Sequence, residues 1–167
     1  MSIIINNATP ADAAEILAYL AQIGGETDNL TFGSEGLPFS AEAEAEYIAG
    51  FANSTESIML VARMGDRIVG TADLNRQPRR MSHRAELGIS VLRDYWGQGI
   101  ATSLMERLIA FAKENDIEII DLEVRSDNAR AIRLYERFGF RKLCTYPRFF
   151  KIGDTYHDFD LMCLSLT

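Results

Sequence analysis

Residues 85–107 read AELGISVLRDYWGQGIATSLMER and carry the clearest structural signal in the chain. Leu87, Ile89 and Val91 alternate with Glu86, Gly88 and Ser90, which is the periodicity of a β-strand. Two glycines then interrupt the alternation, and from residue 100 onward the apolar residues recur at helical spacing. This segment therefore predicts a strand, a glycine-bearing turn and an amphipathic helix.

The turn between the predicted strand and helix contains Gly97 and Gly99. Glycine lets backbone N–H groups approach an anion closely, because no Cβ lies in the way. A helix N-terminus adds unpaired N–H donors and a partial positive charge, so this junction suits a phosphate or pyrophosphate. A tight structural turn explains the two glycines equally well. The loops that bind nucleoside triphosphates or nicotinamide dinucleotides do not fit, because the required lysine and third glycine are missing.

The hexapeptide WGQGIA, residues 96–101, resembles the Gln/Arg-x-x-Gly-x-Gly/Ala signature of the GNAT family of N-acetyltransferases. In that family the signature grips the pyrophosphate of acetyl-coenzyme A (acetyl-CoA). Gly99 takes its first glycine and Ala101 its Gly/Ala position, whereas Trp96 replaces the usual Gln or Arg. The resemblance implies acetyl-CoA as co-substrate, held at Gly97, Gln98, Gly99, Ile100, Ala101 and Thr102.

A second stretch, LEVRSDNARAIRLYERFGFRK at residues 122–142, is similar to the second half of bacterial ribosomal-protein N-terminal acetyltransferases. Together the matching stretches span roughly residues 58–145. The resemblance implies an α/β fold with a mixed, mostly antiparallel sheet, one splayed parallel strand pair and helices on both faces. No repeat, low-complexity tract or linker interrupts the chain, so we expect residues 1–167 to form a single N-acetyltransferase domain.

Gly88 lies inside the predicted central strand, where glycine often marks a bulge or a close approach by a ligand. The family separates this strand from the next parallel one and lays the pantetheine arm of acetyl-CoA in the opening. The resemblance therefore implies that main-chain groups of Ile89, Ser90 and Val91 pair with the pantetheine, as in strand addition. It also implies that Asn128 contacts the cofactor.

Acetyl transfer to an amine requires a base for the amine, stabilisation of the thioester oxygen and a proton for the leaving thiolate. Tyr135 is the candidate acid, because the family places a tyrosine of this helix beside the coenzyme sulfur; its spacing alone favours a core aromatic. Glu86 and Glu123 are candidate bases, and either could equally be a carboxylate of the rim. Protein N-terminal acetyltransferases point to Glu123, but the N-terminal half differs from theirs, so we favour Glu86. His83 is a third candidate.

The composition restricts the partners. A net charge of −7 argues against a general nucleic-acid binder and weakly favours a cationic or amine substrate. The two cysteines, Cys144 and Cys163, suggest neither a disulfide framework nor a metal site, so no metal is expected. No apolar run approaches the roughly 20 residues of a membrane span, and no secretory signal is present. We therefore expect a cytoplasmic protein without a membrane partner.

The remaining elements follow from local signals. Thr9 and Pro10 begin a helix that we expect Gly24 and Gly25 to end, and Asp127 is expected to cap a later helix. The segment 26–39 is predicted to be a loop. The resemblance implies that it helps to wall the acceptor site, which makes Glu26, Asp28, Asn29 and Phe32 substrate candidates; a solvated loop is the alternative for each of them. Further predicted elements are strands 2–6, 58–63, 68–74, 116–124, 140–146 and 156–166 and helices 41–53 and 128–138.

These observations lead to two functional hypotheses. The first is transfer of acetyl from acetyl-CoA to a primary amine of a small molecule or peptide. Direct attack in a ternary complex fits best, because neither cysteine lies in the motifs. The second is a non-catalytic acyl-CoA-binding sensor that keeps the binding site without turnover. The identity of the amine and the choice between monomer and homodimer stay open at this point.

Overall fold

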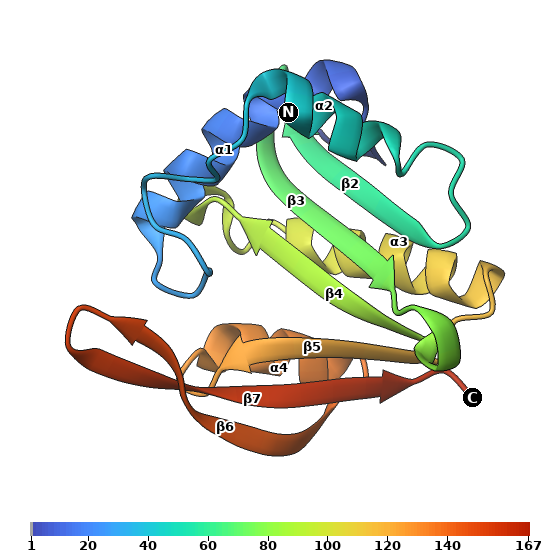
Figure 1. Ribbon diagram of the computed structural model, residues 1–167, viewed down its shortest axis with the longest axis vertical. Helices are drawn as coiled ribbons and strands as arrows, with labels where there is room; N and C mark the ends of the chain where they lie inside the picture. The colour runs from blue at the N-terminus through green and yellow to red at the C-terminus, as the bar shows by residue number, and fades with distance from the viewer. Residues whose placement is uncertain (1) are drawn as a thin grey trace.

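The computed structural model describes residues 2–167, which form one seven-stranded sheet with α-helices on both sides (Figure 1). The strands are β1 (Ile3–Asn7), β2 (Ser57–Met64), β3 (Arg67–Arg76), β4 (Arg84–Val91), β5 (Ile119–Arg125), β6 (Arg141–Ile152) and β7 (Thr155–Ser165). The α-helices are α1 (Ala13–Glu26), α2 (Ala41–Ala49), α3 (Ile100–Glu114) and α4 (Ala129–Arg137). Short 3-10 turns lie at Pro10–Asp12, Arg79–Met81 and Arg93–Tyr95. Within these residues, no helix is both long and apolar enough to cross a membrane.

The strand order in the sheet is β1-β2-β3-β4-β5-β7-β6. Every neighbouring pair is antiparallel except β4 and β5, which α3 connects as a parallel crossover. This arrangement confirms the predicted fold class. It also places the segment 85–107 at the centre of the molecule, because β4 is the middle strand of the seven.

Two apolar clusters hold the layers together. α1 and α2 pack on one face of β2 and β3, where Ile16 and Ile48 contact Val61 in a buried cluster. α3 and α4 pack on the opposite face, where Leu104 and Leu108 join the larger cluster with residues of β2 to β5 and β7. The alternation of residues along β4 thus sends the apolar set toward α3 and leaves the polar set facing α1 and α2.

β4 and β5 pair only at one end. The parallel register covers Arg84–Glu86 with Ile119–Asp121, and Arg84 reinforces it through two hydrogen bonds of 2.7 and 2.6 Å to Asp121. Beyond this point the two strands diverge, as Figure 1 shows. Residues 87–91 of β4 consequently present a strand edge to the opening, while their other edge stays paired with β3.

The prediction that Gly24 and Gly25 end the first helix is wrong, because α1 continues through both glycines to Glu26. Gly24 has a different purpose. A Cβ at this position would lie 2.0 Å from the carbonyl oxygen of Gly33, so the glycine lets the following loop rest directly on the helix. The packing of the loop, not a helix cap, requires this residue.

Gly24→Ala is therefore expected to lower the free energy of unfolding by about 1–3 kcal/mol, the usual range for overpacking. Gly25→Ala is the matched control, because its Cβ would meet only the Ser34 side chain at an ordinary 3.4 Å. Alanine has the higher helix propensity, so this control should gain up to about 1 kcal/mol. Urea unfolding of both variants measures the difference, and equal midpoints would contradict the contact with Gly33.

Two further local predictions need correction, for Asp127 and for the second helix, and the register decides one alternative that was open for Gly88. Asp127 does not cap α4; its carboxylate receives two hydrogen bonds from Arg125, and Asn128 caps the helix instead. Gly88 does not form a bulge, because the register between β3 and β4 runs without a shift past it. The second helix ends at Ala49 rather than residue 53, where Asn53 adopts a positive φ of 55°.

Candidate active site

A cleft of about 1040 Å³ opens between the free edge of β4 and the helices α3 and α4. The C-terminal end of α1 and the loop after it close a third side, through Ile23, Thr27, Asn29 and Leu30. Ten of the sequence-predicted site residues line the cleft: Ile89, Ser90, Val91, Gly97, Gly99, Ile100, Ala101, Thr102, Asn128 and Tyr135. Segments far apart in the sequence therefore meet at the place where β4 and β5 separate.

The turn before α3 has the backbone geometry of an anion cradle. Gly97 and Gly99 both lie in the left-handed region of backbone conformation, with φ of 77° and 80°. Residues with a Cβ rarely adopt this conformation. The first α-helical hydrogen bond runs from the Ser103 amide to the Gly99 carbonyl at 3.0 Å. The amides of residues 100–102 come before Ser103 in the first turn of the helix. Amides of this turn have no intrahelical acceptor, so they are available to an anion.

Trp96 occupies the signature position where the resemblance leads one to expect Gln or Arg. Its indole N–H donates to the Val91 carbonyl at 2.7 Å, which fixes the turn against the end of β4. The Arg130 guanidinium lies 4.7 Å from the centre of the indole ring and brings a positive charge to the cleft. Gln98 lies outside the lining of the cleft.

Tyr135 projects from α4 into the cleft and is only 7% exposed. Its ring packs against Phe140 with 5.8 Å between centroids, and its hydroxyl has no hydrogen-bond partner among residues 2–167. Burial raises the pKa of Tyr135 to about 12. The phenol therefore stays protonated at neutral pH and can donate a proton or a hydrogen bond into the cleft.

Asn128 lies at the N-terminus of α4, where its side-chain oxygen accepts from the Ala131 amide at 3.2 Å. The side chain thus caps the helix that carries Tyr135. Because Asn128 also lines the cleft, a cap and a ligand contact are compatible at this position.

Glu86 and Glu123 lie on the face of the sheet that α1 and α2 cover, outside the lining of the cleft. Both residues are exposed. Burial of part of its side chain raises the pKa of Glu123, and the negative charge of Glu86 raises it further. The two carboxylates therefore interact electrostatically across the opening between β4 and β5.

Asp73 on β3 is a carboxylate that our sequence analysis missed. It lies directly across from Gly88 on the same face as Glu86, and Asn75 donates to it at 2.6 Å. Burial, followed by the charge of Glu86, raises the pKa of Asp73 to about 6. The available signal was Gly88 itself, because a strand glycine often leaves room for a neighbouring group.

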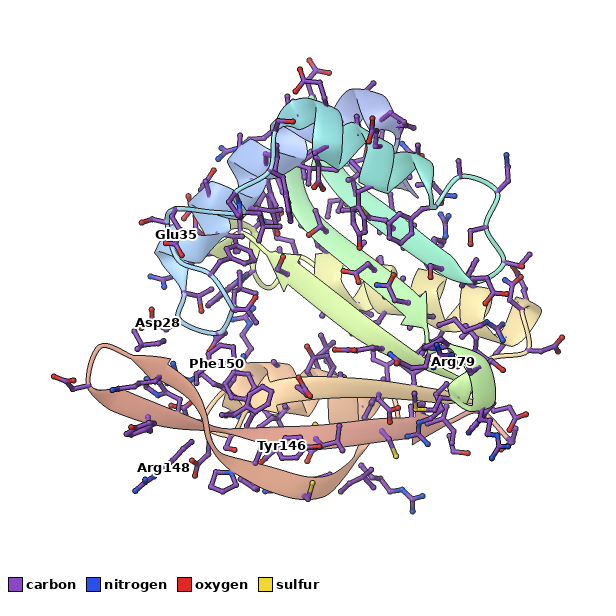
Figure 2. The ribbon with its side chains drawn as sticks, viewed as in Figure 1. Asp28, Glu35, Arg79, Tyr146, Arg148 and Phe150 are labelled. Carbon is purple, nitrogen blue, oxygen red and sulfur yellow. The ribbon has the colours of Figure 1, made fainter. Side chains whose placement is uncertain are left out.

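The candidate residues of the α1–α2 loop separate into two groups. Glu26, Asp28 and Asn29 line a smaller polar cleft of about 470 Å³ beside the first one, together with Arg125. In Figure 2, Asp28 lies on the side of this loop that faces the β6–β7 hairpin, and Phe150 lies on the side of the hairpin that faces the loop. Phe32 instead packs against the apolar cluster beneath α1, so it is a structural residue.

His83 contributes through its backbone. Its carbonyl oxygen accepts hydrogen bonds from the amides of Glu118 and Ile119, at the closed end of the β4–β5 pair. The closed end of the pair lies far along the strands from the cleft. His83 therefore does not lie near the other candidate site residues.

A family model described as the acetyltransferase (GNAT) family matches residues 27–140. The chain belongs to the GNAT family. The match contains β2 to β5, α3 and α4, which are the elements that build the larger cleft. It omits α1, which packs on β2 and β3, and the β6–β7 hairpin, which continues the sheet beyond β5.

Two curated relatives illustrate the range of the GNAT family around this chain. An L-amino acid N-acetyltransferase from Escherichia coli is 39% identical over 85 residues, 48% of this chain and 51% of the relative. An N-alpha-acetyltransferase from Mycobacterium tuberculosis is 34% identical over 93 residues, 55% of this chain and 57% of the relative. The chain thus spans only about half the length of these relatives.

Solved structures of GNAT proteins match over the whole length. An acetyltransferase of the GNAT family from Streptococcus pneumoniae is 27% identical, with a TM-score of 0.94 over 99% of this chain and 100% of that one. The Salmonella typhimurium protein yncA, solved with its cofactor acetyl-CoA, is 20% identical, with a TM-score of 0.86 over 100% of this chain and 95% of that one. The second likeness concerns the fold alone.

Proposed function

We propose that this protein transfers the acetyl group of acetyl-CoA to a primary amine of a small molecule or peptide. The observation that carries this proposal is the free edge of β4 at residues 87–91, which lines one cleft with the α3 N-terminus and Tyr135. The edge supplies main-chain groups for an amide-bearing arm, the helix supplies donors for a pyrophosphate, and the tyrosine supplies a proton. Membership of the GNAT family supports the same reading.

The residues present fit acetyl-CoA on two counts. Residues 89–91 have no strand partner on one edge, as the amides of a pantetheine arm require, and the Val91 carbonyl also accepts from the Trp96 indole. The turn at Gly97 and Gly99 directs the backbone toward the α3 N-terminus, and nothing lies within 4 Å of a Cβ built on Gly99. When bound, acetyl-CoA supplies an activated acetyl group as a thioester.

Ala101→Glu is expected to weaken acetyl-CoA binding at least tenfold, because it places a carboxylate in the cleft where the pyrophosphate is proposed to lie. A tenfold loss corresponds to about 1.4 kcal/mol. Ala110→Glu is the matched control, since Ala110 is exposed on the same helix and is not part of the cleft lining. Titration calorimetry with acetyl-CoA measures both, and equal affinities would move the pyrophosphate elsewhere.

The chemistry that we propose is direct attack by the amine in a ternary complex. Glu86 removes a proton from the acceptor ammonium, and the Tyr135 hydroxyl donates a proton to the sulfur as the carbon–sulfur bond breaks. Glu123 is the alternative base. Cys144 and Cys163 lie on β6 and β7 outside the cleft, so no thiol is positioned to carry the acetyl group.

The alternative is a non-catalytic acyl-CoA sensor. The carboxylates at Asp73, Glu86 and Glu123 favour the enzyme, because binding of acyl-CoA alone has no use for them. Thiol release from acetyl-CoA with a mixed panel of amines distinguishes the two. Amine-dependent release above the hydrolysis background supports the enzyme, whereas binding without release supports the sensor.

The acceptor depends on the parts of the chain outside the family match. The relatives named above are an L-amino acid N-acetyltransferase and an N-alpha-acetyltransferase, and these names favour an α-amine as acceptor. α1 contacts β4 through Tyr19 and Ser90, and β7 pairs with β5. Both therefore border the strands that carry Glu86 and Glu123 and are placed to select the amine. Mass spectrometry of the amine panel identifies it.

We further propose that residues 1–167 act as one N-acetyltransferase domain in the cytoplasm, without nucleic-acid or membrane partners. The net charge of −7 supports the exclusion of nucleic acid, since a binder normally carries a basic surface. One continuous seven-stranded sheet, and a cleft lined by residues from Ile23 to Arg137, support the single domain.

A further inference from the structure

The carboxylate of Asp73 occupies space beside Gly88 that a larger side chain at residue 88 would need. In the antiparallel pair of β3 and β4, Asp73 lies directly opposite Gly88, and Asn75 lies opposite Glu86. Residues that face each other across such a pair point to the same side of the sheet. A Cβ on Gly88 would come within 2.8 Å of Asp73 Oδ1. The glycine thus makes room for this carboxylate beside the strand that lines the cleft.

The carboxylate of Asp73 is held in one orientation. The side-chain nitrogen of Asn75 donates to Asp73 Oδ2 at 2.6 Å, from two residues along the same strand. The other oxygen, Oδ1, points toward Gly88 and so toward β4. The segment 89–91 begins one residue after Gly88, and its free edge lines the cleft.

The groups around Asp73 are acidic or neutral. Burial raises the pKa of Asp73, and the negative charge of Glu86 on β4 raises it further. The same charge also adds to the effect of burial in raising the pKa of Glu123 on β5. From α2, Tyr47 and the buried Glu44 lie on the same side, and the pKa of Tyr47 is raised by burial and then by the charges of Asp73 and Glu44.

The cation on this face of β4, Arg84, is already engaged by Asp121. Among the groups that set the pKa of Asp73, Asn75 favours the ionised form, whereas burial and Glu86 oppose it. A proton therefore binds here more readily than at an ordinary aspartate.

We propose that Asp73 is a proton-relay residue that shares with Glu86 the proton leaving the acceptor amine. This inference rests on the proposed acetyl transfer. The N–H bond of the ammonium breaks, its electron pair stays on nitrogen, and an O–H bond forms on Glu86. The proton then passes to Asp73, directly or through water, and returns to solvent after the amine has attacked the acetyl carbon. Electrons of the carbon–sulfur bond leave with the sulfur, which takes its proton from Tyr135. The second proton that the nitrogen loses as the amide forms returns to the Tyr135 oxygen through water.

The two carboxylates have different environments, which suits different tasks. Glu86 is exposed and can meet the ammonium, whereas Asp73 is half-buried and has a pKa of about 6, near neutral pH. Acid–base groups work best when their pKa lies near the working pH. A half-buried and an exposed carboxylate side by side provide a proton acceptor that remains effective at neutral pH.

The test is the pH dependence of kcat/KM in four proteins, with one amine, so that the ionisation of the substrate is common to all. In the parent, kcat/KM should fall as the pH drops through about 6, because protonated Asp73 cannot take up another proton. Asp73→Asn should remove this limb and lower the plateau about tenfold. Asn75→Ala removes the donor that favours ionised Asp73, so the limb should move to higher pH.

Asp66→Asn is the control, because Asp66 lies in the exposed β2–β3 turn and the variant loses the same single charge. Carbon-13 NMR of the aspartate carboxyls gives a second readout without substrate: the resonance that titrates near pH 6 should be absent in Asp73→Asn. An acidic limb that both Asp73→Asn and Asn75→Ala leave in place would overturn the relay while acetyl transfer stands. A parent that acetylates no amine would remove the proposed function, and the relay with it.

Discussion

Tyr135→Phe should lower kcat about 100-fold or more while leaving the affinity for acetyl-CoA nearly unchanged. The substitution keeps the ring that packs against Phe140 and removes only the hydroxyl. If this hydroxyl protonates the leaving sulfur, its loss should have the effect typical of a general acid, which is on the order of 10²–10⁴. Burial keeps the pKa of Tyr135 near 12, so the parent retains the proton throughout neutral pH.

The measurement is steady-state kinetics with the best amine of the panel, together with calorimetric titration of acetyl-CoA. Tyr156→Phe is the matched control, because Tyr156 is 49% exposed on β7 and is not part of the cleft lining. Equal kcat values for Tyr135→Phe and the parent would return Tyr135 to the role of a core aromatic. A loss of acetyl-CoA affinity without a loss of kcat would assign it to binding.

Glu86→Gln should also lower kcat about 100-fold, whereas Glu123→Gln should lower it less than about tenfold. The two substitutions remove the same charge and keep the shape of the side chain, so each is the control for the other. Glu86 is favoured because it precedes the free edge of β4 and lies beside Asp73. Loss of a positioned base typically costs 10²–10⁴ in rate.

Initial rates at saturating acetyl-CoA and pH 7.5 decide between the two carboxylates. The reverse order would assign the base to Glu123 and bring the acceptor site closer to that of the protein N-terminal acetyltransferases. If neither variant is impaired, the amine arrives without its proton and the enzyme acts mainly by positioning it. Circular dichroism of each variant ensures that unfolding does not account for a slow rate.

The fold was readable from sequence because its central elements have strong periodic patterns. β4 alternates strictly and α3 repeats every three to four residues, so their types and order predict a parallel crossover. Gly139, with φ of 95°, ends the last helix as predicted. Local signals of this kind need no knowledge of the rest of the chain.

The errors arose where tertiary contacts determine the residue. Gly24 has the appearance of a helix terminator, but the contact with Gly33 that requires it is formed by a loop nine residues later. Asp127 and Asn128 are both good caps, and the choice between them is made by Arg125, which binds the aspartate. Neither partner can be identified from spacing along the chain.

The binding half of the candidate site was easier to predict than the acceptor half. Backbone donors at a glycine turn lie within one short segment, so the sequence carries the whole arrangement. Asp73, Glu86 and Glu123 come from three strands, and their association depends on register and on the missing side chain of Gly88. That register is a property of the folded sheet, so the sequence alone did not reveal Asp73.

The short pairing between β4 and β5 makes the stability of the folded protein depend on its ligand. The sheet leaves one strand edge unpaired at residues 87–91, beyond the three residue pairs that join its halves. A bound co-substrate completes that edge, so its binding free energy adds to the free energy of unfolding, about 2.7 kcal/mol at a hundredfold excess over Kd. On the proposed function, we expect resistance to proteolysis to rise with the concentration of acetyl-CoA, so that depletion of acetyl-CoA lowers the stability of the protein as well as its rate.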